Sequence, residues 1–160
     1  MTIKIGDKLP DFTFMGMGEN GPEPVTTDHI FKGVKVALFA VPGAFTPTCS
    51  AKHLPSFKDS AQALRAKGID AIACTSVNDI FVMQAWAQSE GVADDFAMLA
   101  DGNGDFATLL GLELDASGFG MGQRSQRYAM VVNDGVVEAL YVEAPGEYKV
   151  SSADYMLSHL

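Results

Sequence analysis

Apolar and polar positions along this chain form short runs that alternate between the spacing of strands and the spacing of helices. Nearly continuous apolar runs bounded by turn formers are typical of strands buried on both faces. Such runs predict strands at residues 34–41, 69–75 and 96–100. The residues before position 25 are rich in turn formers and predict short strands and loops.

Helical spacing follows each of the first two predicted strands. The first helix is expected over residues 50–67 with a stop at Gly68, and the second begins where Asn78 or Asp79 can cap it. Their apolar positions are Leu54, Phe57, Ala61 and Leu64 in the first helix, and Phe81, Val82, Ala85 and Trp86 in the second. Shorter helices are expected over residues 104–110 and, capped by Ser152, over residues 153–160.

The last part of the chain predicts a β-hairpin. Residues 127–132 and 136–141 are β-rich, and Asn133-Asp134-Gly135 between them is typical of a tight turn. Alternating strands and helices followed by a hairpin and a terminal helix predict an α/β fold. This order is that of a thioredoxin-like fold with an N-terminal β extension and a central mixed sheet flanked by helices. Repeats and linkers are absent from the sequence, so residues 1–160 are predicted to form one domain.

Composition narrows the class of protein. The chain has 160 residues, of which 48% are hydrophobic and 19% charged, as in a globular protein. A net charge of -9 argues against nucleic acid or an anionic membrane as a partner. The N-terminus has no signal-peptide pattern, and the longest apolar run is too short to span a bilayer. Two cysteines form neither a disulfide framework nor a metal-ligand cluster, so we expect a cytoplasmic protein without metal or cofactor.

The segment VPGAFTPTCS, residues 41–50, carries the strongest chemical signal. Pro42, Thr46 and Cys49 give the pattern P-x-x-x-T-x-x-C, with the cysteine at the expected start of a helix. Helix N-termini present unpaired N–H groups and a positive dipole end, which stabilise the nucleophilic thiolate form of cysteine. Thr46 stands where a C-x-x-C motif would have its first cysteine, so dithiol exchange within the motif is excluded. The alternative is that Cys49 is a small apolar residue packed at a strand–helix junction.

This pattern resembles that of the peroxiredoxins, specifically the type II or peroxiredoxin 5 subfamily. The matching segments are residues 33–41, 42–50, 53–55, 76–81 and 124–132. The resemblance implies that the Cys49 thiolate attacks a peroxide oxygen and becomes a sulfenic acid. It also implies that Thr46 and the backbone N–H of Cys49 donate to the peroxide, that Arg127 binds both sulfur and oxygen, and that Pro42 shields the sulfur from water.

Arg124, His53 and the glycines of residues 118–122 also call for an interpretation. Arg124 recurs near the pocket in this subfamily, but a solvated loop arginine fits equally well. His53 lies one helical turn beyond Cys49 and could tune the thiol or bind carboxylates, although the sequence favours a structural role. The glycines of residues 118–122 do not lie between a strand and a helix, which argues against a nucleotide site.

The catalytic cycle needs a reductant for the sulfenic acid. Some members of the subfamily carry a resolving cysteine near the C-terminus, but residues 147–152 contain none. Cys74 falls in a predicted strand and is expected to be buried and inert. The sequence therefore predicts a one-cysteine mechanism acting on hydrogen peroxide and alkyl hydroperoxides, with glutathione and glutaredoxin, or thioredoxin, as electron donor.

The resemblance also implies a homodimer, with the loop near Phe45 and the helix starting at Asp79 close to the contact. Two other classes of function stay open. The protein could be a thiol-based redox sensor or chaperone. Its function would then be to form a stable complex with another protein on oxidation, and not to turn over peroxide. A cysteine hydrolase is the third possibility, but the sequence places no His and Asn/Asp pair near Cys49.

Overall fold

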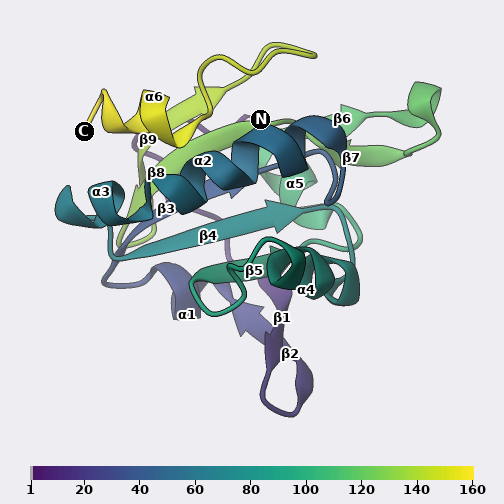
Figure 1. Ribbon diagram of the computed structural model, residues 1–160, viewed down its shortest axis with the longest axis horizontal. Coiled ribbons are helices and arrows are strands. Elements are labelled where there is room, and N and C mark those ends of the chain that lie inside the picture. The colour runs from purple at the N-terminus through teal and green to yellow at the C-terminus, as the bar shows by residue number, and fades with distance from the viewer. Residues whose placement is uncertain (1) are drawn as a thin grey trace.

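The computed structural model describes residues 2–160 and is built around a seven-stranded mixed sheet (Figure 1). Its strands are β1 (Thr13–Gly18), β2 (Gly21–Thr26), β3 (Lys35–Ala40), β4 (Ala71–Ser76), β5 (Phe96–Ala100), β8 (Tyr128–Asn133) and β9 (Val136–Val142). They lie in the order β2-β1-β5-β4-β3-β8-β9. Strands β3, β4 and β5 run parallel to their neighbours in this group, while β1 and β8 pair antiparallel to β5 and β3. A separate hairpin is formed by β6 (Glu113–Asp115) and β7 (Gln123–Ser125).

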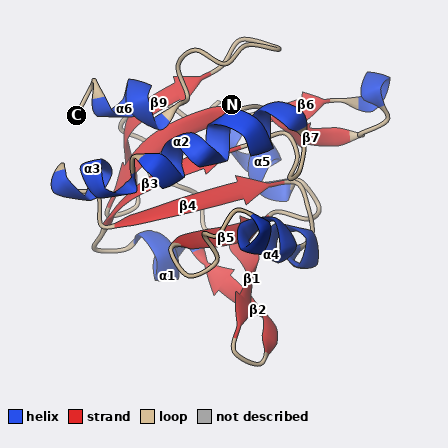
Figure 2. Ribbon diagram, in the orientation of Figure 1, coloured by secondary structure: helices blue, strands red, loops and turns tan. Residues whose placement is uncertain are grey.

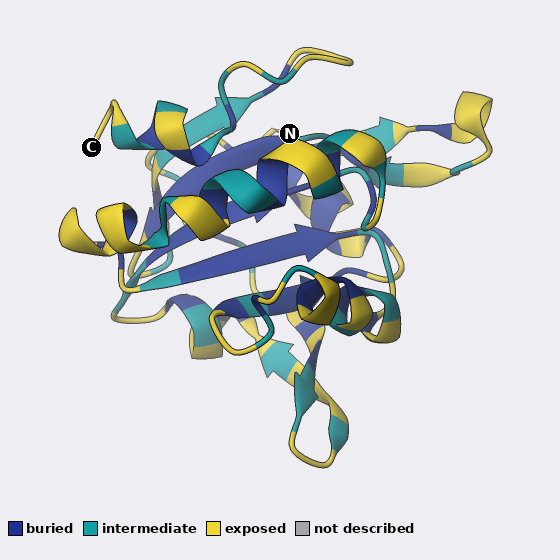
Figure 3. Ribbon diagram, in the orientation of Figure 1, coloured by how far each residue is buried: buried dark blue, intermediate teal, exposed yellow. Residues whose placement is uncertain are grey.

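Helices cover both faces of the sheet (Figure 2). They are α1 (Thr27–Phe31), α2 (Leu54–Asp59), α3 (Ala61–Ala66), α4 (Ile80–Ser89), α5 (Asp105–Leu110) and α6 (Ala153–Leu157). Along β3, Phe39 joins residues of α2, α4 and α6 in one core cluster, and Leu38 joins residues of α1 and α5 in the other. The central strands are accordingly buried on both sides (Figure 3). The predicted thioredoxin-like α/β fold with a mixed sheet is thus confirmed.

The predicted strands are confirmed, and their ends differ from the predicted ones by at most two residues. The hairpin between β8 and β9 turns at Asp134 and Gly135, which have φ values of 50° and 79°. Positive φ is accessible to Gly and, less often, to Asp, which explains the choice of residues at this turn.

The single helix predicted over residues 50–67 is wrong. The structure divides it into a π-helical turn, α2 and α3, with a break at Ser60, whose φ and ψ are −100° and 8°. The Ser60 hydroxyl bonds Asp154 of α6 at 3.3 Å, and serine favours helix ends because its hydroxyl competes for local hydrogen bonds. The last helix, predicted to reach residue 160, ends at Leu157.

Helix α1 and the β6–β7 hairpin are not predicted by the sequence pattern. Both elements are short, and their few residues carry little periodic signal. In Figure 1 the β6–β7 hairpin projects from the body of the molecule at one end of the sheet. No helix within residues 2–160 has the length and apolar character needed to cross a membrane.

Candidate active site

Cys49 lies in the first turn of the helix that follows β3, as its position in the sequence predicted. Helical residues begin at Pro47, and the Ser50 N–H donates to the Thr46 carbonyl at 2.9 Å. Proline suits the first helical position because its missing N–H has no partner there. From Cys49 to His53 the turn widens into a π-helix, in which the Leu54 N–H donates to the Cys49 carbonyl. The cysteine side chain is buried.

Two donors converge on the Cys49 sulfur. The Thr46 hydroxyl oxygen lies 2.8 Å from Sγ, and Nη2 of Arg127 lies 3.1 Å from it. The same hydroxyl lies 2.7 Å from the Gly43 carbonyl. Because a hydroxyl has one proton, it can donate to the carbonyl while a thiol donates to it, or donate to a thiolate. The arrangement thus accommodates both protonation states of the sulfur without movement of heavy atoms.

Arg127 reaches the sulfur because of strand register. In the antiparallel pair β3–β8, Ala40 lies opposite Tyr128, so Arg127 lies beside the start of the loop that carries the cysteine motif. The guanidinium donates through Nη2 to Cys49 and contacts Nδ1 of His53 through Nη1 at 3.0 Å. A planar fork that spans two acceptors is a geometry that arginine supplies and lysine does not.

His53 is fully buried beside Arg127. Its Nε2 lies 2.9 Å from the Ser151 carbonyl, which can only accept, so Nε2 carries the proton and Nδ1 accepts from Arg127. Burial, reinforced by the positive charge of Arg127 and opposed by the Ser151 carbonyl, lowers the pKa of His53 to about 3. His53 is therefore a neutral acceptor that holds Arg127, and its partners are not the carboxylates that the sequence suggested.

Other side chains hold the loop before Cys49. Oδ1 of Asn78 accepts from the Ala44 N–H at 2.9 Å, whereas its neighbour Asp79 caps α4. Nε1 of Trp86, from α4, donates to the hydroxyl of Ser50 at 3.1 Å. These contacts fasten the cysteine turn to the end of β4 and to the helix that follows it.

Arg124 is not a solvated loop residue. Its Nε donates to the Met121 carbonyl at 2.8 Å, and its Nη1 donates to the Val77 carbonyl at 3.0 Å. A side chain at Gly43 would come within 3.4 Å of Nη1, which shows how closely the guanidinium approaches the cysteine loop. Arg124 therefore ties the β6–β7 hairpin to the loop after β4, and neither of its bonds involves Cys49.

A cavity of about 560 Å³ opens beside these residues. Pro42, Thr48 and Arg127 line it on the side of the cysteine motif, and Tyr148 lines it on the side of the loop after β9. The Tyr148 ring lies 5.4 Å from the His53 ring and 5.9 Å from the Arg127 guanidinium carbon. The cavity gives a small solute access to Arg127, which in turn contacts the buried sulfur.

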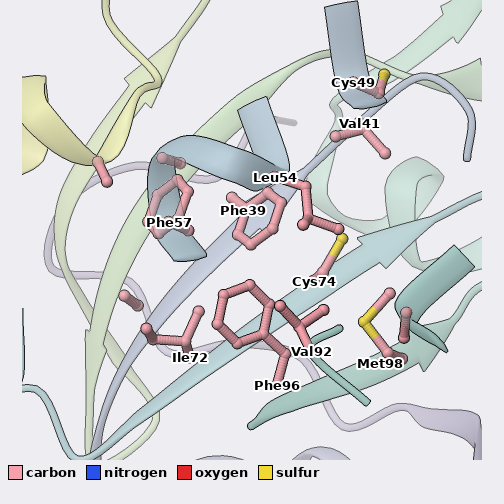
Figure 4. Packing of buried hydrophobic residues seen from close by; sticks show 14 of the residues in the cluster. Phe39, Val41, Cys49, Leu54, Phe57, Ile72, Cys74, Val92, Phe96 and Met98 are labelled. Carbon is pink, nitrogen blue, oxygen red and sulfur yellow. The ribbon is translucent and has the colours of Figure 1, made fainter. Parts of the chain in front are cut away.

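Cys74 shares a core cluster with Cys49 but, among the described residues, is not hydrogen-bonded to Cys49, Thr46 or Arg127. It lies in the middle of β4 with its side chain fully buried, and burial raises the pKa of its thiol. Figure 4 shows it beside Leu54, while the Cys49 sulfur points away from it. Both cysteines are free. A raised pKa keeps the Cys74 thiol protonated, and the protonated form is not the nucleophile.

The structure also bears on metal and hydrolase chemistry. Within the described residues, no group of three or more His, Cys, Asp and Glu side chains could hold a metal ion. Both ring nitrogens of His53 are engaged by Arg127 and Ser151, so His53 does not act as a base for Cys49. The Cys–His pair that a cysteine hydrolase needs is therefore not formed by these two residues.

Comparison with known proteins identifies the family. Residues 4–157 match the family model described as Redoxin. The chain is 50% identical to peroxiredoxin-2E of Arabidopsis thaliana, a chloroplastic protein, over 99% of this chain and 70% of that protein. The chain is a peroxiredoxin of the type II or peroxiredoxin 5 subfamily.

Solved structures of peroxiredoxins resemble this chain over nearly its whole length. Reduced Prx3 of Vibrio vulnificus in complex with hydrogen peroxide has a TM-score of 0.94 and 49% identity, covering 99% of each chain. The antioxidant protein of Plasmodium falciparum, a 1-Cys peroxiredoxin, has a TM-score of 0.90 and 27% identity, covering 98% of each chain. Peroxiredoxins are thiol peroxidases, so this protein is an enzyme of that class.

The sequence pattern predicts Pro42, Thr46, Cys49 and Arg127 as site residues. In the structure Thr46 and Arg127 contact the Cys49 sulfur, whereas Pro42 lines the cavity that also reaches Arg127. The sequence pattern did not predict that the loop after β9, which includes Glu143, Tyr148 and Ser151, takes part in the site. A glutamate at the end of a strand gives no recognisable motif.

Proposed function

We propose that this peroxiredoxin reduces hydrogen peroxide and alkyl hydroperoxides through the thiolate of Cys49. The sulfur attacks one peroxide oxygen, an S–O bond forms and the O–O bond breaks. The leaving oxygen takes a proton and departs as water or an alcohol, and Cys49 becomes a sulfenic acid. The observation that carries the proposal is the convergence of Thr46 and Arg127 on the Cys49 sulfur, at 2.8 and 3.1 Å.

The same donors fit the demands of the transition state. Negative charge moves from sulfur to the leaving oxygen, and fixed donors aimed at that charge lower the barrier. The Arg127 guanidinium is held through Nη1 by His53, which is neutral and does not cancel its charge. The guanidinium therefore presents its positive charge to the sulfur through Nη2. The complex of Vibrio vulnificus Prx3 with hydrogen peroxide supports this substrate class.

We propose further that the cycle uses one cysteine. An external thiol condenses with the sulfenic acid to give a mixed disulfide and water, and a second thiol releases Cys49 by exchange. Burial of Cys74 supports this scheme, as does the similarity to a 1-Cys peroxiredoxin. The donor is glutathione with glutaredoxin, or thioredoxin. Two free cysteines fit a reducing compartment, and on that ground we propose a cytoplasmic location.

A homodimer is also proposed, supported by apolar groups at the predicted contact. Phe45 and Phe81 are 52% and 65% exposed, and the Phe45 ring lies 6.4 Å from that of Trp86 in the helix that also carries Phe81. Exposed aromatic side chains gathered over one helix are typical of an interface between protein chains.

Turnover of the two serine variants tests the one-cysteine cycle. With peroxide and either thiol donor system, Cys74→Ser should keep wild-type turnover and Cys49→Ser should have none. A Cys74→Ser enzyme that is oxidised by one equivalent of peroxide but cannot turn over would contradict the one-cysteine cycle.

A further inference from the structure

We infer that Glu143 is a positioning residue for the peroxidase site, acting through Ser151 and His53 on Arg127. The inference rests on the proposed role of Arg127 at the Cys49 sulfur. Glu143 itself has no hydrogen bond to Cys49, His53 or the Arg127 side chain among the contacts of the described residues.

The Glu143 carboxylate holds the loop after β9, which lines the cavity. Glu143 is 6% exposed and lies just after β9. Its Oε2 accepts from the N–H groups of Lys149, Val150 and Ser151 at 2.8, 2.9 and 2.8 Å, and from the Ser151 hydroxyl at 2.7 Å. Although burial raises its pKa, these donors outweigh burial and lower the pKa of Glu143 below its ordinary value. An ionised carboxylate with this many donors fixes the backbone of the loop.

The fixed backbone presents one acceptor to the site. The Ser151 carbonyl lies 2.9 Å from Nε2 of His53, and this bond decides which ring nitrogen carries the proton. With the proton on Nε2, the lone pair of Nδ1 faces Arg127, 3.0 Å from Nη1. If the loop moved and the proton passed to Nδ1, then Nδ1 would have no lone pair and could not accept the hydrogen bond from the Arg127 guanidinium.

The link from Glu143 to the sulfur is therefore continuous. Glu143 holds Ser151, Ser151 sets the His53 tautomer, and His53 holds the guanidinium whose other nitrogen lies 3.1 Å from the Cys49 sulfur. A second tie runs through the backbone, because the Glu143 N–H donates to the Arg127 carbonyl at 3.0 Å.

Truncation of Glu143 tests the inference against a matched control. Asp101 is likewise a buried carboxylate, 3% exposed, that accepts from backbone N–H groups, those of Phe106 and Ala107 at 3.0 Å. Glu143→Ala should lower kcat/KM for hydrogen peroxide by about 10-fold to 100-fold, the scale of a small misplacement of a reacting group. Asp101→Ala should lose stability but keep kcat/KM. Glu143→Gln should recover most of the rate, because its amide oxygen can replace Oε2.

Nuclear magnetic resonance of histidine labelled with nitrogen-15 gives a readout that does not depend on turnover. Wild type should show His53 as a single neutral tautomer with a protected Nε2 proton, and Glu143→Ala should lose that signature. This readout separates the inference from the proposed function, because a wild type that fails to reduce peroxide would leave it measurable. If Glu143→Ala does not fold, Glu143→Asp, whose shorter side chain cannot reach all four donors, should lose the signature in its place.

A double variant tests whether the effect passes through His53. In a His53→Ala background, Glu143→Ala should cause little further loss of kcat/KM. An equal loss in both backgrounds would overturn the inference. So would a Glu143→Ala enzyme that matches Asp101→Ala in rate and keeps the wild-type His53 signature.

Discussion

Replacement of His53 by glutamine should remove a pH-dependent loss of stability. In wild type the buried ring has a pKa of about 3, against an ordinary value of 6.5 in the unfolded chain. Glutamine does not titrate, yet its amide N–H can donate to the Ser151 carbonyl and its oxygen can accept from Arg127. His53→Gln thus preserves both hydrogen bonds and removes the ionisation. It also removes the ring that packs against Phe39, Phe57 and Tyr148, but that loss is the same at every pH.

The sign and size follow from proton linkage. Above pH 6.5 His53 is neutral in both states, so its contribution to stability is fully present. As the pH falls from 6.5 towards 3, the unfolded chain binds a proton that the native protein does not. The free energy of unfolding therefore falls by about 1.4 kcal/mol per pH unit, or by roughly 3 kcal/mol over two units. This is a large part of the about 5–15 kcal/mol that stabilises an ordinary domain.

Urea denaturation at a series of pH values between neutral and mildly acidic checks this expectation. Other groups titrate in the same range, but they are common to both proteins and cancel in the difference. His29→Gln, which changes an exposed histidine, serves as the control and should follow wild type. Parallel stability curves for wild type and His53→Gln would refute the argument that His53 is buried in its neutral form.

Two further expectations concern the sulfur and the surface. Arg127→Gln should lower kcat/KM for hydrogen peroxide by about 10² to 10³-fold in stopped-flow assays, since it removes a charged donor at the reacting sulfur, and Arg127→Lys should recover only part of the rate. Phe81→Asp should shift the protein towards monomer in sedimentation velocity, while Leu109→Asp, at a position 52% exposed on α5, should not; a monomeric wild type would contradict the proposed dimer.

The central strands of this fold could be predicted because buried strands consist of nearly continuous apolar residues. Strand β3 is apolar at successive positions since it packs on both faces, and Phe39 and Leu38 lie in different core clusters. The helical region after β3 could also be predicted, but the positions at which it is interrupted could not. The π-turn at Cys49–His53 and the break at Ser60 depend on tertiary contacts, such as that between Ser60 and Asp154, which local spacing does not encode.

The candidate site divides in the same way. Pro42, Thr46 and Cys49 form a local motif, and Arg127 could be matched through the family resemblance. The partners of His53 could not be predicted, because Arg127 and Ser151 lie 74 and 98 residues away in the chain. The contacts of Arg124 could not be predicted for a similar reason, since its acceptors are backbone carbonyls that any sequence provides.

The most direct test of the account is the intact mass of reduced protein within seconds of mixing with one equivalent of hydrogen peroxide. The account predicts a rapid gain of one oxygen that is absent in Cys49→Ser. Loss of two hydrogens would show that Cys74 forms a disulfide and would contradict the one-cysteine cycle. No rapid change in mass would contradict the claim that Thr46 and Arg127 hold Cys49 ready to attack a peroxide.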